Sequence, residues 1–66
     1  MSWELYEVMA TDERGHQALY YATKSLKEAR QMAQQSLKEG FVHAEVNRET
    51  EDGDSEQVYE CGTLPP

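Results

Sequence analysis

Residues 25–40 have the sequence SLKEARQMAQQSLKEG, which predicts an α-helix. Ser25 and Glu28 have the S-x-x-E spacing of a capping box, in which the serine hydroxyl accepts the Glu28 N–H and the glutamate carboxylate reaches back to the Ser25 N–H. No Gly, Pro or β-branched residue interrupts residues 26–39, and Gly40 is suited to ending the helix. Spacings of three and four place the apolar residues on one narrow stripe: Leu26, Ala29, Ala33 and Leu37, with Met32 and Ser36 beside them. A stripe so rich in alanine favours close packing against a flat β-sheet.

Two alternating segments precede this helix and two follow it. Residues 3–11 (WELYEVMAT) and 17–23 (QALYYAT) predict a first pair of strands. Residues 41–49 (FVHAEVNRE) and 57–61 (QVYEC) predict a second pair around an Asp-Gly turn at 52–53. The sequence therefore predicts an α+β, two-layer ββαββ fold, with a four-stranded, mostly antiparallel sheet and one helix packed on one face. The strand order is left open.

We expect residues 1–62 to form a single domain and residues 63–66, which end in two prolines, to form a flexible tail. A chain of 66 residues buries only a small core, and its one cysteine, Cys61, allows no internal disulfide. The predicted core consists of these strand residues against the helix stripe: Tyr6, Val8, Ala10, Ala18, Tyr20, Val42, Ala44 and Val46.

The sheet face away from the helix is predicted to be apolar. By alternation it would carry Trp3, Leu5, Met9, Leu19, Tyr21, Phe41, His43, Tyr59 and Cys61. Exposed apolar patches mark partner sites, and Trp, Tyr and Phe are enriched in interface cores. We therefore predict a partner-binding surface made of Trp3, Leu5, Tyr21, Phe41, His43 and Tyr59. The alternative is a sheet with two mixed faces, in which twist or a β-bulge turns some of these residues toward the core.

The net charge of −7 is unevenly distributed. Residues 23–40 carry four Lys or Arg and two Glu, whereas residues 41–66 carry seven acidic residues and one arginine. The densest acidic run, residues 49–56, lacks the EF-hand spacing and is either a solvated turn or a docking strip for a basic partner. The second interpretation assigns an acidic rim to Glu51, Asp52, Asp54 and Glu56.

The sequence offers little for catalysis or metal binding. His16, His43 and Cys61 are far apart, and a His43–Cys61 pair on neighbouring strands would be too few ligands for zinc. We expect no enzymatic activity, no cofactor, no metal and no small-molecule substrate. Nucleic-acid binding is disfavoured because the predicted outer strands carry Glu7, Glu45 and Glu60 where Lys and Arg would be needed.

The leading functional prediction is a small, acidic, non-enzymatic protein-interaction module that forms a homodimer or docks a partner through the aromatic sheet face. In size and charge the chain is similar to phage-encoded inhibitors such as anti-CRISPR and anti-restriction proteins, some of which present carboxylates where DNA phosphates would sit. That similarity implies an alternative, an inhibitor that occupies a nucleic-acid site on a host protein. A second alternative is a sheet that binds single-stranded nucleic acid. The N-terminus has no signal-peptide pattern and no apolar run is long enough to cross a membrane, so we expect a cytoplasmic protein.

Overall fold

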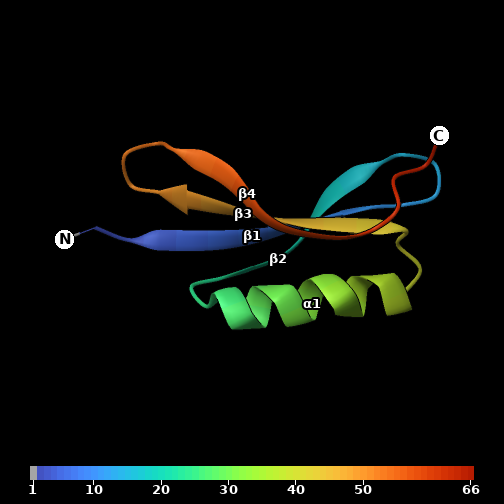
Figure 1. The fold of residues 1–66 in the computed structure, drawn as a ribbon, viewed down its shortest axis with the longest axis horizontal. Helices are drawn as coiled ribbons and strands as arrows, with labels where there is room; N and C mark the ends of the chain where they lie inside the picture. Colours follow the sequence, from blue (N-terminus) through green and yellow to red (C-terminus); the bar gives the residue numbers. More distant parts are fainter. Residues whose placement is uncertain (1) are drawn as a thin grey trace.

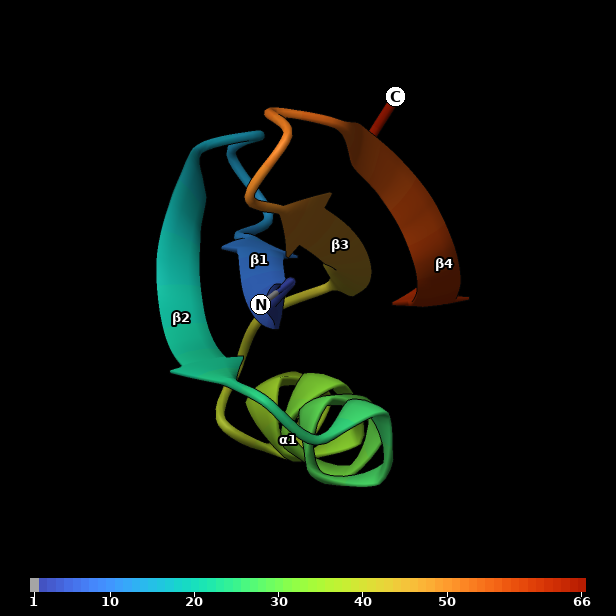
Figure 2. The ribbon, with the colours of Figure 1, turned by 90° about the vertical axis from the view of Figure 1, so that its left-hand side faces the viewer.

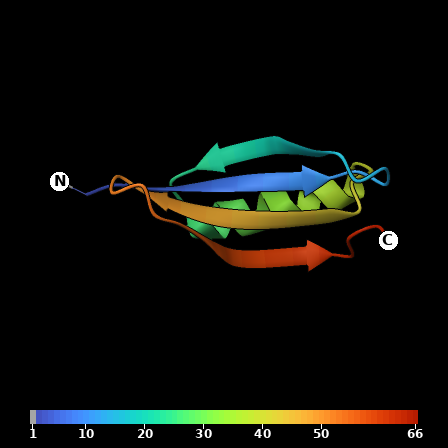
Figure 3. The same cartoon turned by 90° about the horizontal axis from the view of Figure 1, so that it is seen from above.

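The computed structural model describes residues 2–66 and shows four strands and one helix in the order ββαββ (Figure 1). The elements are β1 (Glu4–Thr11), β2 (Gln17–Thr23), α1 (Leu26–Lys38), β3 (His43–Thr50) and β4 (Ser55–Gly62). All pairings are antiparallel and the strand order is β2-β1-β3-β4, so β1 and β3 are central and β2 and β4 form the edges (Figure 3). The predicted α+β, two-layer ββαββ fold is confirmed.

The helix covers one face of a strongly twisted sheet. In Figures 1 and 2, α1 lies below β1 and β3, and no helix or strand of residues 2–66 lies over the opposite face of the sheet. This arrangement produces an elongated molecule of 40 × 20 × 15 Å. We call the uncovered side the open face.

The core lies between α1 and the two central strands. Val8 and Val46 are fully buried opposite each other, next to the buried Ala29 and Ala33 of the helix. Small helix residues allow α1 to approach the sheet closely, as the alanine-rich stripe predicted. The buried stripe of the helix differs from the predicted one. Ser36 is fully buried, whereas Leu26 at the helix start is 36% exposed. Ser36 tolerates burial because its hydroxyl donates a 2.7 Å hydrogen bond to the carbonyl of Ala33.

The rest of the predicted core is confirmed in part. Ala10 and Ala44 are fully buried, and Tyr6 and Tyr20 pack at the edge of the core. Ala18 is exposed although it lies opposite the buried Ala10, because it belongs to the edge strand β2. The prediction that Ala18 belongs to the core is therefore wrong.

The helix begins with half of the predicted capping box. Ser25 is the N-cap, and its hydroxyl accepts the N–H of Glu28 at 3.2 Å. The reciprocal bond is replaced, because the N–H of Ser25 donates to Thr23 Oγ1 at 3.1 Å. The Glu28 carboxylate instead accepts a 2.7 Å hydrogen bond from the hydroxyl of Tyr21. The cap thus connects the helix to β2.

A bulge in β2 changes the direction of its side chains. Val8 lies opposite Tyr21, whereas the next residue of β1, Met9, lies opposite Leu19. Tyr20 is the extra residue between them. A bulge interrupts the strict alternation of faces along a strand.

Both tyrosines of β2 consequently lie on the helix side. The Tyr20 hydroxyl donates to Glu39 after the end of α1, and the Tyr21 hydroxyl donates to Glu28 at its start. The sequence predicted Tyr21 on the opposite face. That placement is wrong because the alternating pattern of the sequence does not reveal the extra residue of a bulge.

A second bulge occurs in the other edge strand. Val46 lies opposite Tyr59 and Asn47 opposite Gln57, so Val58 is the extra residue. Val58 and Tyr59 both pack against the core. The two bulges therefore turn aromatic residues of both edge strands toward the helix.

The C-terminal residues 63–66 follow β4 toward the β1–β2 turn. The N–H of Thr63 donates a 2.9 Å hydrogen bond to the carbonyl of Val42, and Pro65 is half-buried beside Gly15. Leu64 remains 58% exposed.

Candidate functional site: the open face of the sheet

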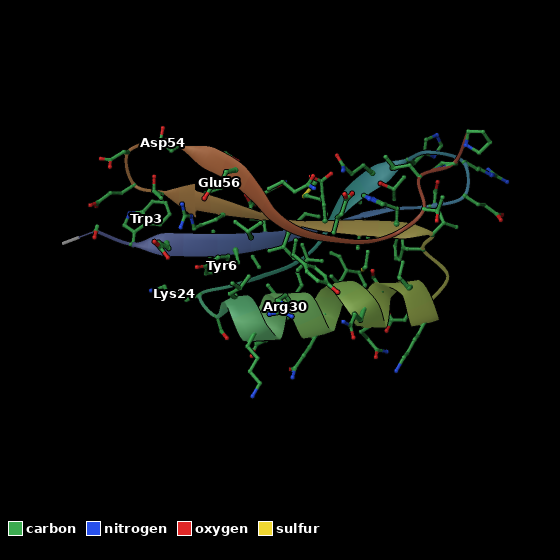
Figure 4. The ribbon with its side chains drawn as sticks, in the orientation of Figure 1. Trp3, Tyr6, Lys24, Arg30, Asp54 and Glu56 are labelled. Carbon is green, nitrogen blue, oxygen red and sulfur yellow. The ribbon has the colours of Figure 1, made fainter. Side chains whose placement is uncertain are left out.

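The open face is built mainly from the central strands. On β1 and β3, the residues that alternate with the buried ones point away from the helix. With their cross-strand neighbours on the edge strands, these residues include Leu5, Glu7, Met9, Leu19, Glu45, Asn47, Glu49 and Glu60. Trp3 precedes β1 and lies on the same side of the sheet (Figure 4). The face therefore combines four carboxylates with apolar side chains that include Trp3, Leu5, Met9 and Leu19.

Two of these carboxylates are direct cross-strand neighbours. Glu45 on β3 lies opposite Glu60 on β4. Glu45 accepts a 2.9 Å hydrogen bond from the amide of Gln17, and Glu60 lies 3.0 Å from Nε2 of His43. Like charges in direct cross-strand positions destabilise a sheet. No Lys or Arg of the four strands offsets them on this face, because the one basic strand residue, Arg48, lies opposite Tyr6 on the helix side.

The other two carboxylates are also neighbours. The hydrogen bond between Glu7 and Glu49, together with partial burial, raises the pKa of Glu7 above its ordinary value. The physical cause is that two carboxylates side by side are more stable when they share a proton. This pair is therefore a second place on the open face where two carboxylates meet.

His43 closes one end of the open face. Its side chain is only 4% exposed, and its Nε2 atom contacts Glu60 at 3.0 Å. Its other ring nitrogen, Nδ1, is buried and has no hydrogen-bond partner in the described part of the chain. His43 is thus a packed residue at the border of the face and contributes little accessible surface.

The predicted partner-binding residues are divided between the two sides of the sheet. Trp3, 47% exposed, and Leu5 belong to the open face as predicted. Phe41 does not, because its ring packs edge-on against that of Tyr20 with centroids 5.7 Å apart on the helix side. The predicted position of Phe41 is therefore wrong.

Tyr59 and Cys61 were also predicted on the outer face and lie on the helix side. The Tyr59 hydroxyl accepts a 2.9 Å hydrogen bond from Gln34, and Arg30 stacks over its ring at 5.3 Å. Cys61 packs against the core, and burial raises the pKa of its thiol. His43 and Cys61 thus lie on opposite faces, so a joint metal or catalytic site at these two residues is not formed. A uniformly aromatic outer face does not exist, because these side chains fill the gap between the edge strands and α1.

The acidic rim lies at one end of the molecule, in and after the β3–β4 turn. Glu51, Asp52, Asp54 and Glu56 are all exposed (Figure 4). Glu56 is nevertheless engaged, because its carboxylate accepts a hydrogen bond from the guanidinium of Arg48. The rim is therefore distinct from the four carboxylates of the open face.

Positive charge is concentrated on the other side of the molecule. Lys27, Arg30 and Lys38 are exposed on α1, and Lys24 is exposed just before it. Figure 4 labels Lys24 and Arg30 at the helix. Because α1 covers the face opposite the open one, the molecule has an acidic side and a basic side. The uneven charge distribution along the sequence thus corresponds to an acidic sheet face and a basic helix face.

The sequence indicated part of this acidic face. Glu7, Glu45 and Glu60 argued against nucleic-acid binding, but their grouping around a shared surface was not predicted. The signal is the spacing of Glu45, Asn47 and Glu49, which places three polar residues on one side of a strand whose other side is core.

Comparison with protein-family models, curated proteins and solved structures finds no match. The described residues include no group of three or more His, Cys, Asp or Glu side chains arranged to hold a metal ion. Among residues 2–66, no helix is long and apolar enough to cross a membrane.

Proposed function

We propose that this protein is a protein-binding module that docks a basic, partly apolar partner surface through its open face. The observation that carries the proposal is the direct pairing of Glu45 with Glu60 on a sheet face that no element covers. Like charges in directly opposed cross-strand positions disfavour a sheet, although Gln17 donates a hydrogen bond to Glu45 and His43 contacts Glu60. A partner with Lys or Arg side chains would relieve the repulsion on binding.

The apolar residues of the open face supply the second part of the contact. Met9 lies between Leu19 and Glu45 in the strand ladder, and Leu5 lies opposite Glu49. Apolar side chains are thus interleaved with carboxylates across the same surface. In protein interfaces, apolar contacts supply most of the affinity, while charge complementarity fixes the partner and speeds association.

This surface favours a foreign partner over a second copy. Two open faces brought together would oppose Glu7, Glu45, Glu49 and Glu60 to the same four residues. Such like-charge contacts suppress an interaction. Homodimerisation through this face, the first form of the sequence prediction, is therefore not proposed.

The proposal is tested with a synthetic peptide that alternates lysine and leucine, titrated into isotope-labelled protein by NMR. We expect amide shifts at open-face residues of β1 and β3 and few on α1. The variant Glu45→Gln/Glu60→Gln should raise the Kd for the peptide about tenfold or more, which corresponds to roughly 1.4 kcal/mol of binding free energy.

The matched control is Glu51→Gln/Asp52→Asn, which removes the same charge from the β3–β4 turn. We expect it to reduce affinity much less. If both variants weaken binding equally, only net charge matters and the open face is not a specific site. If the turn variant has the larger effect, the acidic rim is the binding surface and the inhibitor alternative gains support.

A single-stranded nucleic-acid-binding function has no support from the geometry. Such sheets expose aromatic side chains for stacking between basic residues. Here Tyr21 and Tyr59 contact the helix, and the exposed face carries carboxylates.

A further inference from the structure

The edge strand β2 is the one strand without a charged side chain. Its sequence is QALYYAT, whereas β1, β3 and β4 each carry at least two charged residues. Ala18, Leu19, Tyr21 and Ala22 are all exposed along it. No other helix or strand in the described part of the chain covers its outer edge (Figures 2 and 3). An uncharged, exposed edge presents free backbone N–H and C=O groups that can pair with another strand.

We propose that two copies of the chain associate by antiparallel pairing of β2 with β2, forming a continuous eight-stranded sheet. A two-fold axis perpendicular to the sheet relates the copies, so both helices lie on the same side. This inference concerns a different surface from the proposed function and does not depend on it.

Charge complementarity favours the second copy as occupant of this edge. One end of β2 follows the turn with Asp12, Glu13 and Arg14, which is acidic by one charge. The other end leads to Lys24, Lys27 and Glu28, which is basic by one charge. Antiparallel pairing places the acidic end of each copy beside the basic end of the other. Asp12 is ionised in this arrangement, because hydrogen bonds from the backbone N–H groups of His16 and Arg14 lower the pKa of its carboxyl.

The bulge at Tyr20 is compatible with this pairing. Bulges generally protect edges, because they disrupt the regular row of backbone groups. Here Leu19 and Ala22 both point to the open face, since Leu19 lies opposite Met9 and Ala22 opposite Glu7. Pairing Leu19 with the partner's Ala22 therefore matches the faces of the two strands on either side of the bulge.

The other edge is much less suited to self-pairing. The strand β4 carries Glu56 and Glu60, so its pairing with a second β4 would bring four carboxylates to one seam. In a chain of net charge −7, two copies already repel each other. Of the two sheet edges, the neutral β2 edge adds no like-charge contact to that repulsion.

The first measurement is sedimentation equilibrium from micromolar to millimolar concentration, combined with hydrogen exchange at both extremes. We expect a reversible dimer, with β2 amides gaining protection as concentration rises and β4 amides unchanged. The variant Ala18→Lys/Ala22→Lys should raise the dimer Kd at least about tenfold, equivalent to ~1.4 kcal/mol. The matched variant Ser55→Lys/Gln57→Lys adds the same charge to exposed positions of β4 and should not raise it.

A monomer at every concentration would overturn the proposal. So would a dimer whose β2 amides remain unprotected, or one that the β4 variant dissociates as strongly. If the β2 variant fails to fold by circular dichroism, the exchange experiment on the unaltered chain decides alone. The peptide titration measures binding at the open face of a dilute monomer. Absence of the dimer therefore does not contradict the docking proposal, and absence of peptide binding does not contradict the dimer.

Discussion

The hydroxyl of Tyr21 on β2 donates a 2.7 Å hydrogen bond to the carboxylate of Glu28 in the first turn of α1. This contact joins the edge strand to the helix start and uses the carboxylate that would otherwise complete the capping box. Bonds from Tyr21 and then Thr23 lower the pKa of Glu28. The acidic residue also lies at the positive end of the helix dipole, where negative charge is favourable.

We expect Tyr21→Phe to lower the melting temperature at pH 7 by a small but measurable amount. Because the pKa of Glu28 is lower in the folded state, its stabilisation is present above the unfolded pKa and is lost as pH falls through the folded pKa. The gap between the variant and the unaltered protein should therefore shrink in acid. Thermal unfolding followed by circular dichroism from pH 7 to pH 3 measures it.

Tyr6→Phe is the matched control, because the Tyr6 hydroxyl donates to Glu4 two residues away on the same strand. It joins no separate elements, so its removal should cost less. An equal loss for both variants would show that the Tyr21–Glu28 bond does not anchor the helix.

Glu7→Gln should stabilise the protein at neutral pH. The pKa of Glu7 is raised by Glu49, so the contribution of the pair is favourable below the unfolded pKa and is lost as pH rises through the folded pKa. Relief of a like-charge cross-strand contact is expected to add roughly 0.2–1 kcal/mol at pH 7. Urea unfolding at pH 7 and at pH 4 measures the gain, which should be smaller at pH 4.

Glu13→Gln provides the control for net charge, since Glu13 lies in the exposed β1–β2 turn. A similar gain from both substitutions would mean that overall charge, and not the Glu7–Glu49 contact, limits stability.

Ala33→Leu should destabilise the fold by roughly 1–3 kcal/mol, because overpacking a buried site forces strained rotamers or backbone shifts. Ala33 is fully buried between α1 and the sheet. Gln31→Leu is the matched substitution on the exposed side of the same helix and should be nearly neutral. Equal stabilities of the two variants in urea unfolding would show that α1 is not closely packed.

Gly62→Ala should destabilise the protein more than Gly53→Ala. Both glycines have positive φ, 80° and 88°, so either substitution carries a backbone cost of roughly 1–2 kcal/mol. A methyl group on Gly62 would also lie 2.2 Å from the carbonyl oxygen of Val42, whereas none of the described atoms lies within 4 Å of one on Gly53. Chemical denaturation of both variants should show the larger loss at Gly62, and equal losses would indicate that the Val42 backbone moves freely.

Prediction from sequence succeeded where alternation was unbroken. Along β1 and β3, which pair without a register shift, Val8, Ala10, Ala44 and Val46 were assigned to the correct face. The helix was predicted from its cap and its alanine spacing, because these signals are local. The ββαββ architecture followed from these elements.

The candidate site was harder to predict because each edge strand contains one extra residue. An extra residue looks like any other in a sequence, yet it turns every side chain beyond it to the other face. Tyr21 and Tyr59 were consequently misplaced, and an aromatic face was expected where an acidic one exists. The strand order also depends on contacts between distant segments, which no local pattern encodes.

The position of Trp3 has a spectroscopic consequence. It is the one tryptophan of the chain, it is 47% exposed, and it lies beside the open face and away from α1. Its emission should therefore respond weakly when the helix detaches from the sheet, whereas all four tyrosines lie on the helix side and report on that event. A ligand that covers the open face should instead shift indole emission to the blue and shield it from iodide. Tyrosine emission would thus report on unfolding and tryptophan emission on docking. Both processes can be followed in one unlabelled sample.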